Sequence, residues 1–420
     1  MEIRSRTSWK DQLKENLFPK LEQDLTADVV IIGGGLAGII SGYFLVLEGK
    51  RVVLLEERKA LGSFATGHTT AFLTGVIDTN LVTLAEMFGE ERAAKVWQSG
   101  LASIDEFERI IEKEKIDCEF MRCPYFDYAN NPKQFSSLEK EHEIASKLGF
   151  QTSLSRTNDL SFPNFGYLKM EEQAKFDPLK FLNQLANKAK NLGLKIFADS
   201  EVIGIDRGRL ITAKTQNGSV KAEKLIVATY QPFDNRGTWF KKGMYRSYVF
   251  EINLAPGQIA EGLYVDGDNP YHYFRIDRLG EYDRMIIGGE DHRKEFKTDR
   301  MKQKSFRLLS DYAKNILRGK THEFVRKWDG PILEPIDGVA LIGSVEPNEF
   351  VATGFSGNGM TYSMISGLIF CDLVLNRENP WVELYNPKRI PGFSQLAKKG
   401  RDYLGEFFGG PLFRSPKPAY

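Results

Sequence analysis

The sequence predicts an α/β fold with two domains, a dinucleotide-binding domain on a largely parallel sheet and a second, α+β domain on an antiparallel sheet. Residues 28–56 read as strand, glycine turn, helix, strand and acid. Residues 245–292 alternate in the manner of strands and are divided by Gly and Pro turns. The length of 420 residues exceeds the roughly 250–300 at which a single core stops growing.

The glycine-rich turn gives each of its glycines a separate task. Gly33 allows the tight turn off the first strand, Gly35 lets the backbone approach a pyrophosphate, and Gly38 lets the next helix pack closely on the sheet. The N-terminus of that helix would face the phosphates with its unpaired N–H groups and its positive dipole end, and we expect Leu36 and Ala37 of the turn to contact the cofactor. We therefore expect a Rossmann-like dinucleotide site here.

An acidic residue ends the second strand at the position that a dinucleotide site requires. Glu56 follows Gly38 by 18 residues (56 − 38), close to the ~20 expected for the acid that accepts a hydrogen bond from a ribose hydroxyl. Glu57 and Arg58 come next and are expected beside the same ligand. The alternative is an ordinary βαβ turn, and the strand, helix and acid together favour the dinucleotide.

Composition narrows the class of partner. Lys and Arg total 57 against 56 Asp and Glu, so no overall charge attracts nucleic acid or an anionic membrane. The segment 29–47 is apolar, but its glycines interrupt a membrane span. Cys118, Cys123 and Cys371 suit neither a disulfide framework nor a metal site, and no leader pattern precedes them, so we expect structural thiols, no metal and a cytoplasmic location.

The order of patterns suggests a discontinuous domain arrangement. Residues 1–25 form an arm with Trp9 as a packing anchor, and residues 381–420 form a C-terminal tail. The dinucleotide domain combines 26–80, 172–232 and 335–380, and the second domain combines 81–171 and 233–334.

A loop of small polar residues follows the second strand, at the edge of a parallel sheet where ligands usually bind. His68 is the only ionisable group between Lys59 and Asp78. We expect Thr69 and Thr70 to contact the cofactor. His68 itself is either a solvated loop residue or a contact of the cofactor.

The region after this loop reads as helix over 82–115, strand over 116–130 and helix over 139–148. Tyr125, Phe126 and Tyr128 are candidates for a pocket, although aromatic residues at strand spacing are more often part of the core.

The second part of the dinucleotide domain begins with Asp177 at an N-cap and Pro178 at the first helical position. An antiparallel ribbon spans 201–222. A buried strand then ends at Ala228 and Thr229, which we expect at the site.

The closing segment contains two further strands and a second glycine-rich turn. Gly343 and Gly354 belong to these strands, and a helix through about Leu375 follows the turn. The N–H donors at the start of that helix suit a group that becomes anionic; we expect contacts there from Gly357, Asn358, Gly359 and Met360. In the second domain, Arg275 sits among aromatic residues and could bind a substrate carboxylate or belong to a structural ion pair.

Taken together, these motifs resemble the D-amino-acid-oxidase-like superfamily of FAD-dependent oxidoreductases. The resemblance spans roughly residues 5–390 and rests on GGGLAG with Glu56, the FDP helix start, LIVATY, and PIDGVALIG followed by ATGFSGNGM. It implies an FAD-binding domain of the glutathione-reductase type, with the adenine at Val202. The chain is most similar to a bacterial subgroup often fused to a Rieske domain in three features: the Trp-containing arm, the TGHTTA loop and the GGEDH segment. A Rieske domain needs two Cys and two His, and no Cys or His follows Cys371.

The resemblance implies oxidation of a C–N bond of a small amine or amino acid, by hydride transfer to flavin, to give an imine. The acceptor of the electrons is either O2 or a redox partner. The alternatives are a flavin dehydrogenase of a hydroxy acid or alcohol, and a flavin-binding protein without turnover. Some relatives attach FAD through a His in the loop after the second strand, which adds a covalent bond to the alternatives for His68.

Overall fold

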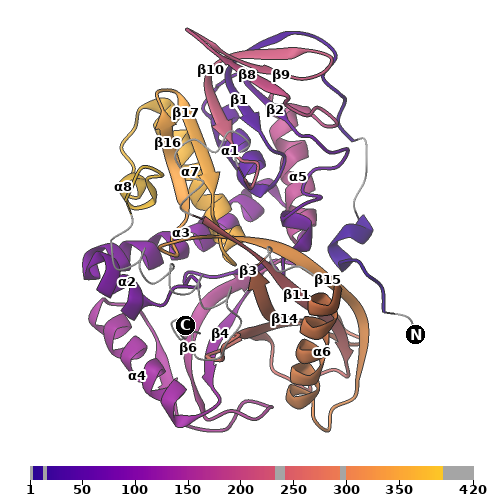
Figure 1. Ribbon diagram of the computed structural model, residues 1–420, viewed down its shortest axis with the longest axis vertical. Coiled ribbons are helices and arrows are strands. Elements are labelled where there is room, and N and C mark those ends of the chain that lie inside the picture. The colour runs from indigo at the N-terminus through magenta and orange to yellow at the C-terminus, as the bar shows by residue number, and fades with distance from the viewer. Residues whose placement is uncertain (1–2, 13–16, 232–241, 294–298, 391–420) are drawn as a thin grey trace.

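A computed structural model describes residues 3–12, 17–231, 242–293 and 299–390. The chain forms two sheets with their helices, one above the other in Figure 1. The predicted α/β fold with two sheet-based parts is confirmed. Within the described residues, no helix is both long and apolar enough to cross a membrane.

The first sheet has a parallel centre with strand order β17-β10-β1-β2-β7. Its strands are β1 (Leu25–Ile32), β2 (Val52–Leu55), β7 (Lys195–Phe197), β10 (Ser219–Val227) and β17 (Glu349–Thr353). β16 (Leu341–Glu346) pairs antiparallel with β17, while β8 (Gly204–Arg207) and β9 (Ile211–Lys214) form a ribbon with the start of β10. β10 therefore unites the predicted ribbon and the predicted buried strand in one strand.

The register of this sheet brings the cofactor motifs together. Ile32 of β1 lies beside Leu55 of β2 and beside Val227 of β10. The next residues along each strand are Gly33, Glu56 and Ala228, so the glycine turn, the acid and the end of β10 share one edge. Ligands of open parallel sheets bind at this carboxyl edge.

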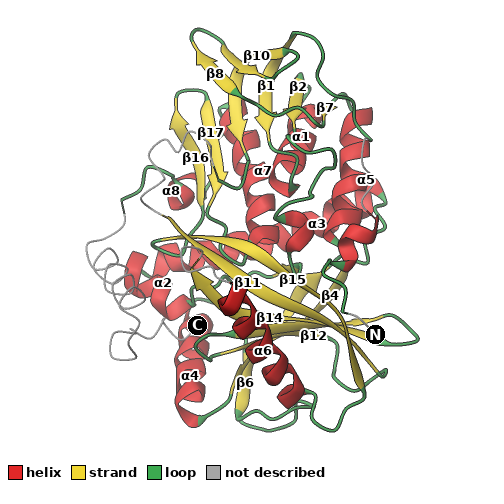
Figure 2. Cartoon of the chain, turned by 45° about the vertical axis from the view of Figure 1, so that its right-hand side comes forward, coloured by secondary structure: helices red, strands yellow, loops and turns green. Residues whose placement is uncertain are grey.

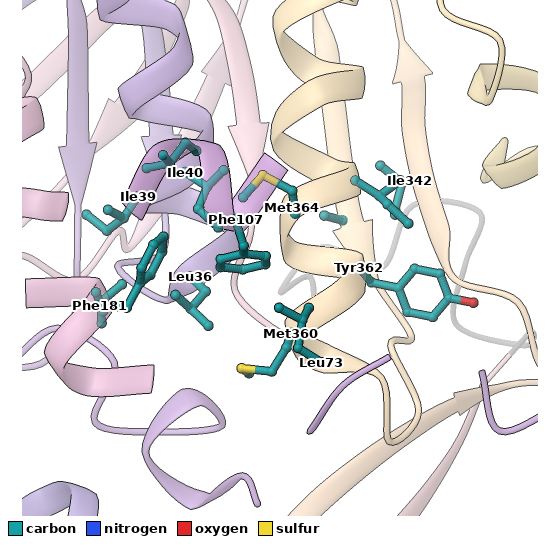
Figure 3. Packing of buried hydrophobic residues seen from close by; sticks show 14 of the residues in the cluster. Leu36, Ile39, Ile40, Leu73, Phe107, Phe181, Ile342, Met360, Tyr362 and Met364 are labelled. Atoms are coloured by element: carbon teal, nitrogen blue, oxygen red, sulfur yellow. The ribbon is translucent and has the colours of Figure 1, made fainter. Parts of the chain in front are cut away.

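Four helices pack around the first sheet. They are α1 (Leu36–Leu47), α3 (Glu90–Glu114), α5 (Pro178–Asn191) and α7 (Gly359–Leu375). Figure 3 shows side chains of α1 meeting Met360 and Met364 of α7, with Phe107 and Phe181 closing the same core. The predicted cap of α5 is confirmed, because Asp177 accepts hydrogen bonds from the backbone of Leu179 and Lys180, both at 3.0 Å. The short α8 (Val382–Tyr385) follows α7.

The second sheet has the order β15-β11-β14-β13-β12-β4-β6-β3, with β5 beside β6. It is antiparallel except for the β4–β12 pair. Its strands are β3 (Phe72–Leu73), β4 (Met121–Ala129), β5 (Ser153–Ser155), β6 (Gly166–Lys175), β11 (Lys242–Leu254), β12 (Gly262–Asp266), β13 (His272–Arg278), β14 (Asp283–Arg293) and β15 (His322–Pro335). α6 (Asp299–Ile316) covers the face turned away from the first sheet (Figure 2).

Two predicted segments have different bounds in the structure. The helical pattern over 82–115 is divided by Gly89, whose φ of +83° ends α2 (Leu81–Phe88) before α3 begins. The predicted helix over 139–148 begins earlier, because Asn131 caps α4 (Pro132–Lys147) by accepting from the backbone of Gln134. β3 pairs with β6, so the chain enters the second sheet before residue 80.

The N-terminal arm is held by Trp9 of η1 (Ser8–Gln12). Trp9 is 1% exposed, and its indole Nε1 donates to the carbonyl of Thr69 at 2.8 Å. The guanidinium groups of Arg275 and Arg284 lie 5.3 and 4.7 Å from the centre of the Trp9 ring. The arm thus packs against both the second sheet and the loop that follows β2. Most of the predicted C-terminal tail lies outside the described residues.

Candidate active site

One cavity of about 430 Å³ begins at the carboxyl edge of the first sheet and ends on the second sheet. Its size falls within the roughly 300–1,000 Å³ of ligand pockets. The β1–α1 turn, the end of β2, the loop through η2 (Thr66–His68), the end of β10 and the β17–α7 turn form one part of its wall. Strands β4, β6, β12 and β13 form the other part.

Gly33, Gly35 and Gly38 of the β1–α1 turn have different structural requirements. A Cβ on Gly33, whose φ is +112°, would collide with the carbonyl of Ala228, and a Cβ on Gly38 would collide with the carbonyl of Gly33. A Cβ on Gly35 would meet only Thr66 Oγ1, at 3.3 Å. The folded chain therefore requires glycine at 33 and 38, whereas Gly35 leaves open backbone on the cavity wall. Such a cradle fits a pyrophosphate that approaches the start of α1.

Glu56 connects the end of β2 to this turn. The side chain is buried, its Oε2 accepts from the Gly34 backbone at 2.6 Å, and its Oε1 accepts from the Arg58 backbone at 3.0 Å. Burial raises the pKa of Glu56, and these two N–H groups oppose that rise. The carboxylate lines the cavity together with Glu57 and Arg58. This is the place that a ribose hydroxyl would occupy in the dinucleotide motif.

His68 is partly buried rather than solvated. Its Nδ1 lies 2.6 Å from the carbonyl of Phe64, and its Nε2 lies 2.9 Å from Lys10 Nζ. Burial lowers the pKa of His68, so the ring is neutral near pH 7. We assign Nδ1–H as the donor to Phe64 and Nε2 as the acceptor from Lys10. Both ring nitrogens are therefore engaged within the protein, and the ring still lines the cavity.

The β17–α7 turn forms the opposite end of the cofactor wall. Gly357 donates its backbone N–H to Asp78 Oδ2 at 2.7 Å, and Asn358 Oδ1 accepts from the Asp78 backbone at 3.0 Å. Asp78 precedes α2 and was not identified from the sequence. α7 begins at Gly359 without a side-chain cap, which leaves its first N–H groups for a ligand.

Most residues predicted for the cofactor line this cavity. They are Gly33, Gly35, Leu36, Ala37, Glu56, Glu57, Arg58, Thr69, Thr70, Val202, Ala228, Thr229, Gly354, Gly357, Asn358, Gly359 and Met360. Gly38 does not line the cavity; it lies behind the turn, where it packs closely against the Gly33 carbonyl. Gly343, also expected at the cofactor, lies in β16 and does not line the cavity; its φ is +142°, and a Cβ there would meet Pro387 Cδ at 3.1 Å.

Arg275 does not line the cavity. It is 1% exposed, and its Nε donates to Asp277 Oδ1 at 2.9 Å. One terminal nitrogen donates to the carbonyls of Thr70, Ala71 and Phe176 at 2.9–3.2 Å. The expected substrate-binding role does not fit this geometry. The structural ion pair, which was the alternative, describes it.

The second sheet supplies a wall that the sequence indicated only in part. On β4, Phe126 and Tyr128 enter the core beneath the sheet, whereas Tyr125 and Asp127 face the cavity. Successive strand residues point to opposite faces, so alternation within the aromatic run could have identified this division. Other residues of this wall are Phe72, Leu168, Met170, Ser247, Val249, Val265, Tyr271, Tyr273 and Ile332. Trp97 of α3 and Glu141 of α4 also line the cavity.

Two glycine turns and a buried acid around one cavity, with a second sheet closing its far side, define the site of a dinucleotide-binding protein. Comparison with known families then identifies the family. The chain belongs to the DAO family, described as FAD dependent oxidoreductase, which matches residues 28–373. FAD is therefore the dinucleotide cofactor of this chain.

Individual relatives agree with this assignment. The Bacillus subtilis protein YhfW, named as a Rieske 2Fe-2S iron-sulfur protein, is 29% identical over 97% of this chain and 80% of its own length. Gamma-glutamylputrescine oxidoreductase of Escherichia coli is 22% identical over 85% of each chain. The crystal structure of glycine oxidase from Geobacillus kaustophilus has a TM-score of 0.73, with 20% identity, covering 88% of this chain and 100% of that one. This structural likeness bears on the fold.

Proposed function

We propose that this FAD-dependent oxidoreductase oxidises a C–N bond of an amine or amino acid by hydride transfer to FAD, giving an imine. The observation that carries the proposal is the continuity of the cavity from the FAD-binding turns to an aromatic and apolar wall on the second sheet. A small substrate held against this wall would meet the cofactor away from bulk water. The names of two relatives, gamma-glutamylputrescine oxidoreductase and glycine oxidase, support the amine class.

When bound, FAD supplies the acceptor for a hydride from the carbon beside the amine nitrogen. The chain supplies the enclosure and the orientation. Tyr273 reaches Ser247 Oγ at 3.0 Å, and Tyr271 donates to Asp291 Oδ2 at 3.2 Å. Burial raises the pKa of Tyr273, so this phenol stays protonated and acts by hydrogen bonding. These fixed hydroxyls and the neutral ring of His68 give the wall polarity without placing a cation in it.

Anaerobic titration of the purified holoenzyme with amines, amino acids, hydroxy acids and alcohols tests the proposal. Loss of the oxidised-flavin absorption with amines or amino acids, and release of ammonia or a shorter amine on readmitting acceptor, is the expected result. Reduction by hydroxy acids or alcohols alone would refute the C–N assignment. If none of these compounds reduces the flavin but dithionite reduces it normally, the result would instead favour a flavin-binding protein without turnover.

A further inference from the structure

Asp127 occupies an unusual position in the wall of the second sheet. It lies on β4 between Leu168 of β6 and Val265 of β12, both of which also line the cavity. Its side chain belongs to the same face of the strand as Tyr125, two residues earlier. A carboxylic acid is thus built into a wall that is otherwise mainly apolar and aromatic.

The Asp127 carboxyl group lacks the partners that the neighbouring acids have. Its Oδ1 is sealed from solvent and accepts no hydrogen bond from the described residues. By contrast, Glu141 accepts from the backbone of Leu81 at 2.6 Å and of Val82 at 3.1 Å. Buried polar atoms are nearly always paired, and an unpaired one needs a specific explanation. A ligand in the cavity is the explanation we develop.

The charges around Asp127 specify the kind of ligand. Burial raises the pKa of Asp127 well above its ordinary value, and the negative charges of Glu141 and Asp266 add to the rise. Arg58 is the only Lys or Arg among the described residues that line the cavity, and it lies beside Glu57 at the ribose end. A cation that arrives with the substrate would relieve this imbalance, because it favours the ionised carboxylate.

The position of Asp127 relative to the cofactor follows from its neighbours. Asp78 contacts the β17–α7 turn, and its charge acts on Tyr125 together with those of Asp127 and Glu141. The charges that act on Asp127 are those of Glu141, which lines the same cavity, and of Asp266, the residue after Val265 on β12. Asp127 belongs to the wall of the second sheet, whereas the turns that would hold FAD lie at the carboxyl edge of the first sheet. A group bound by Asp127 is therefore held apart from those turns.

From these observations we infer that the substrate is an amine carrying a second, positively charged group remote from the bond that is oxidised, and that Asp127 binds this group. The nature of the oxidised bond rests on the function proposed above. The binding of a remote cation by Asp127 does not, because it depends only on the unpaired carboxyl and its surroundings. Asp127 is then a specificity-determining residue.

Calorimetry on the holoenzyme tests the inference without turnover, with flavin kept reduced by dithionite. 1,5-Diaminopentane and pentylamine have the same chain length and differ only in the second ammonium. We expect the diamine to bind about ten- to a hundredfold more tightly, equivalent to ~1.4–2.8 kcal/mol. Equal binding, or preference for pentylamine, would overturn the inference.

Two variants assign the preference to this side chain. Asp127→Asn keeps the shape and removes the charge, so the two amines should bind equally while pentylamine binding stays unchanged. Asp127→Glu keeps the charge and should retain a preference for the diamine, which also controls for loss of folding in the Asn variant. A diamine preference that survives in Asp127→Asn refutes the assignment.

Flavin reduction by the same amines separates this inference from the proposed function. If the function holds, Asp127→Asn should raise KM for the diamine and leave kcat nearly constant. An equal fall in kcat for both amines would mean that Asp127 takes part in the reaction itself, which contradicts a specificity role. If no amine reduces the flavin, the proposed function fails, while the calorimetric comparison still decides the role of Asp127.

Discussion

Replacement of Gly35 by Ala separates the demands of the fold from those of the cofactor. Gly35 has φ −80° and ψ −177°, a conformation open to any residue, and its added Cβ would meet only Thr66 Oγ1 at 3.3 Å. Gly→Ala at such a position stabilises by ~0.4–1 kcal/mol through the unfolded chain, and Ala at an N-cap costs a similar amount. The free energy of unfolding of the Gly35→Ala apoprotein should therefore lie within about 1 kcal/mol of the wild-type value.

Binding of FAD should respond very differently. The Cβ would occupy backbone space that the pyrophosphate approaches, and overpacking of one carbon costs ~1–3 kcal/mol. At ~1.4 kcal/mol per factor of ten, Gly35→Ala should weaken FAD binding by roughly five- to 150-fold. The measurement is calorimetric titration of apoprotein with FAD, alongside urea unfolding of the same samples.

Two further glycines provide the controls for this experiment. Gly208→Ala lies outside the cavity and its Cβ would meet only Leu210 O at 3.7 Å, so FAD affinity should not change. Gly38→Ala collides with the Gly33 carbonyl and should destabilise the apoprotein itself. An unchanged FAD affinity in well-folded Gly35→Ala would refute the placement of the pyrophosphate at this turn.

Three further predictions concern buried polar groups. Because both nitrogens of His68 are engaged within the protein, acid precipitation should release all flavin into the supernatant; flavin retained in the pellet and lost in His68→Ala would contradict this. Burial would lower the pKa of His272, but hydrogen bonds with Asp266 and Glu290 raise it to about 9. This raised pKa contributes up to ~3 kcal/mol to the free energy of unfolding. The contribution is complete below pH ~6.5 and is lost as pH rises through about 9. If urea unfolding of a His272→Gln variant shows the same fall in free energy with pH as wild type, the assignment to His272 is refuted. Arg275→Met should lower the free energy of unfolding by ~1–3 kcal/mol, since Asp277 keeps Arg284 and Lys175 but the buried carbonyls that Arg275 serves lose their donor. KM should stay unchanged in protein that folds; a raised KM at normal stability would restore the substrate role.

The cofactor half of the site could be predicted from sequence because its determinants are local. The turn from Gly33 to Gly38 and the acid Glu56 belong to one strand–helix–strand unit, and parallel pairing of β1, β2 and β10 fixes their common edge. Backbone conformation and close approach at a glycine depend on few neighbours. Gly343 shows the limit, since a glycine in the sequence does not by itself reveal whether a ligand or a neighbouring residue, here Pro387, approaches its backbone.

The substrate half depends on partners that are distant in sequence. Tyr273 and Arg275 lie on one face of β13, and Tyr271, the residue before the strand, continues their alternation; the two tyrosines line the cavity. Two residues further along, the same face passes beneath the loop after β2, so Arg275 meets backbone carbonyls instead of the cavity. Periodicity predicts the face of a strand. It does not predict where along that face the cavity ends, because the covering loop determines this.

That loop also explains why the arm and the second sheet matter to a cofactor site. Its backbone leaves regular structure while partly buried, so its carbonyl groups need donors from elsewhere. Four consecutive carbonyls each accept from a side chain of another element: His68 from Trp328 of β15, Thr69 from Trp9 of the arm, and Thr70 and Ala71 from Arg275 of β13. Because these donors belong to the protein, the wall is ordered before a ligand arrives. Binding then avoids the cost of ordering the loop, ~0.5–1.5 kcal/mol for each side chain that is already fixed.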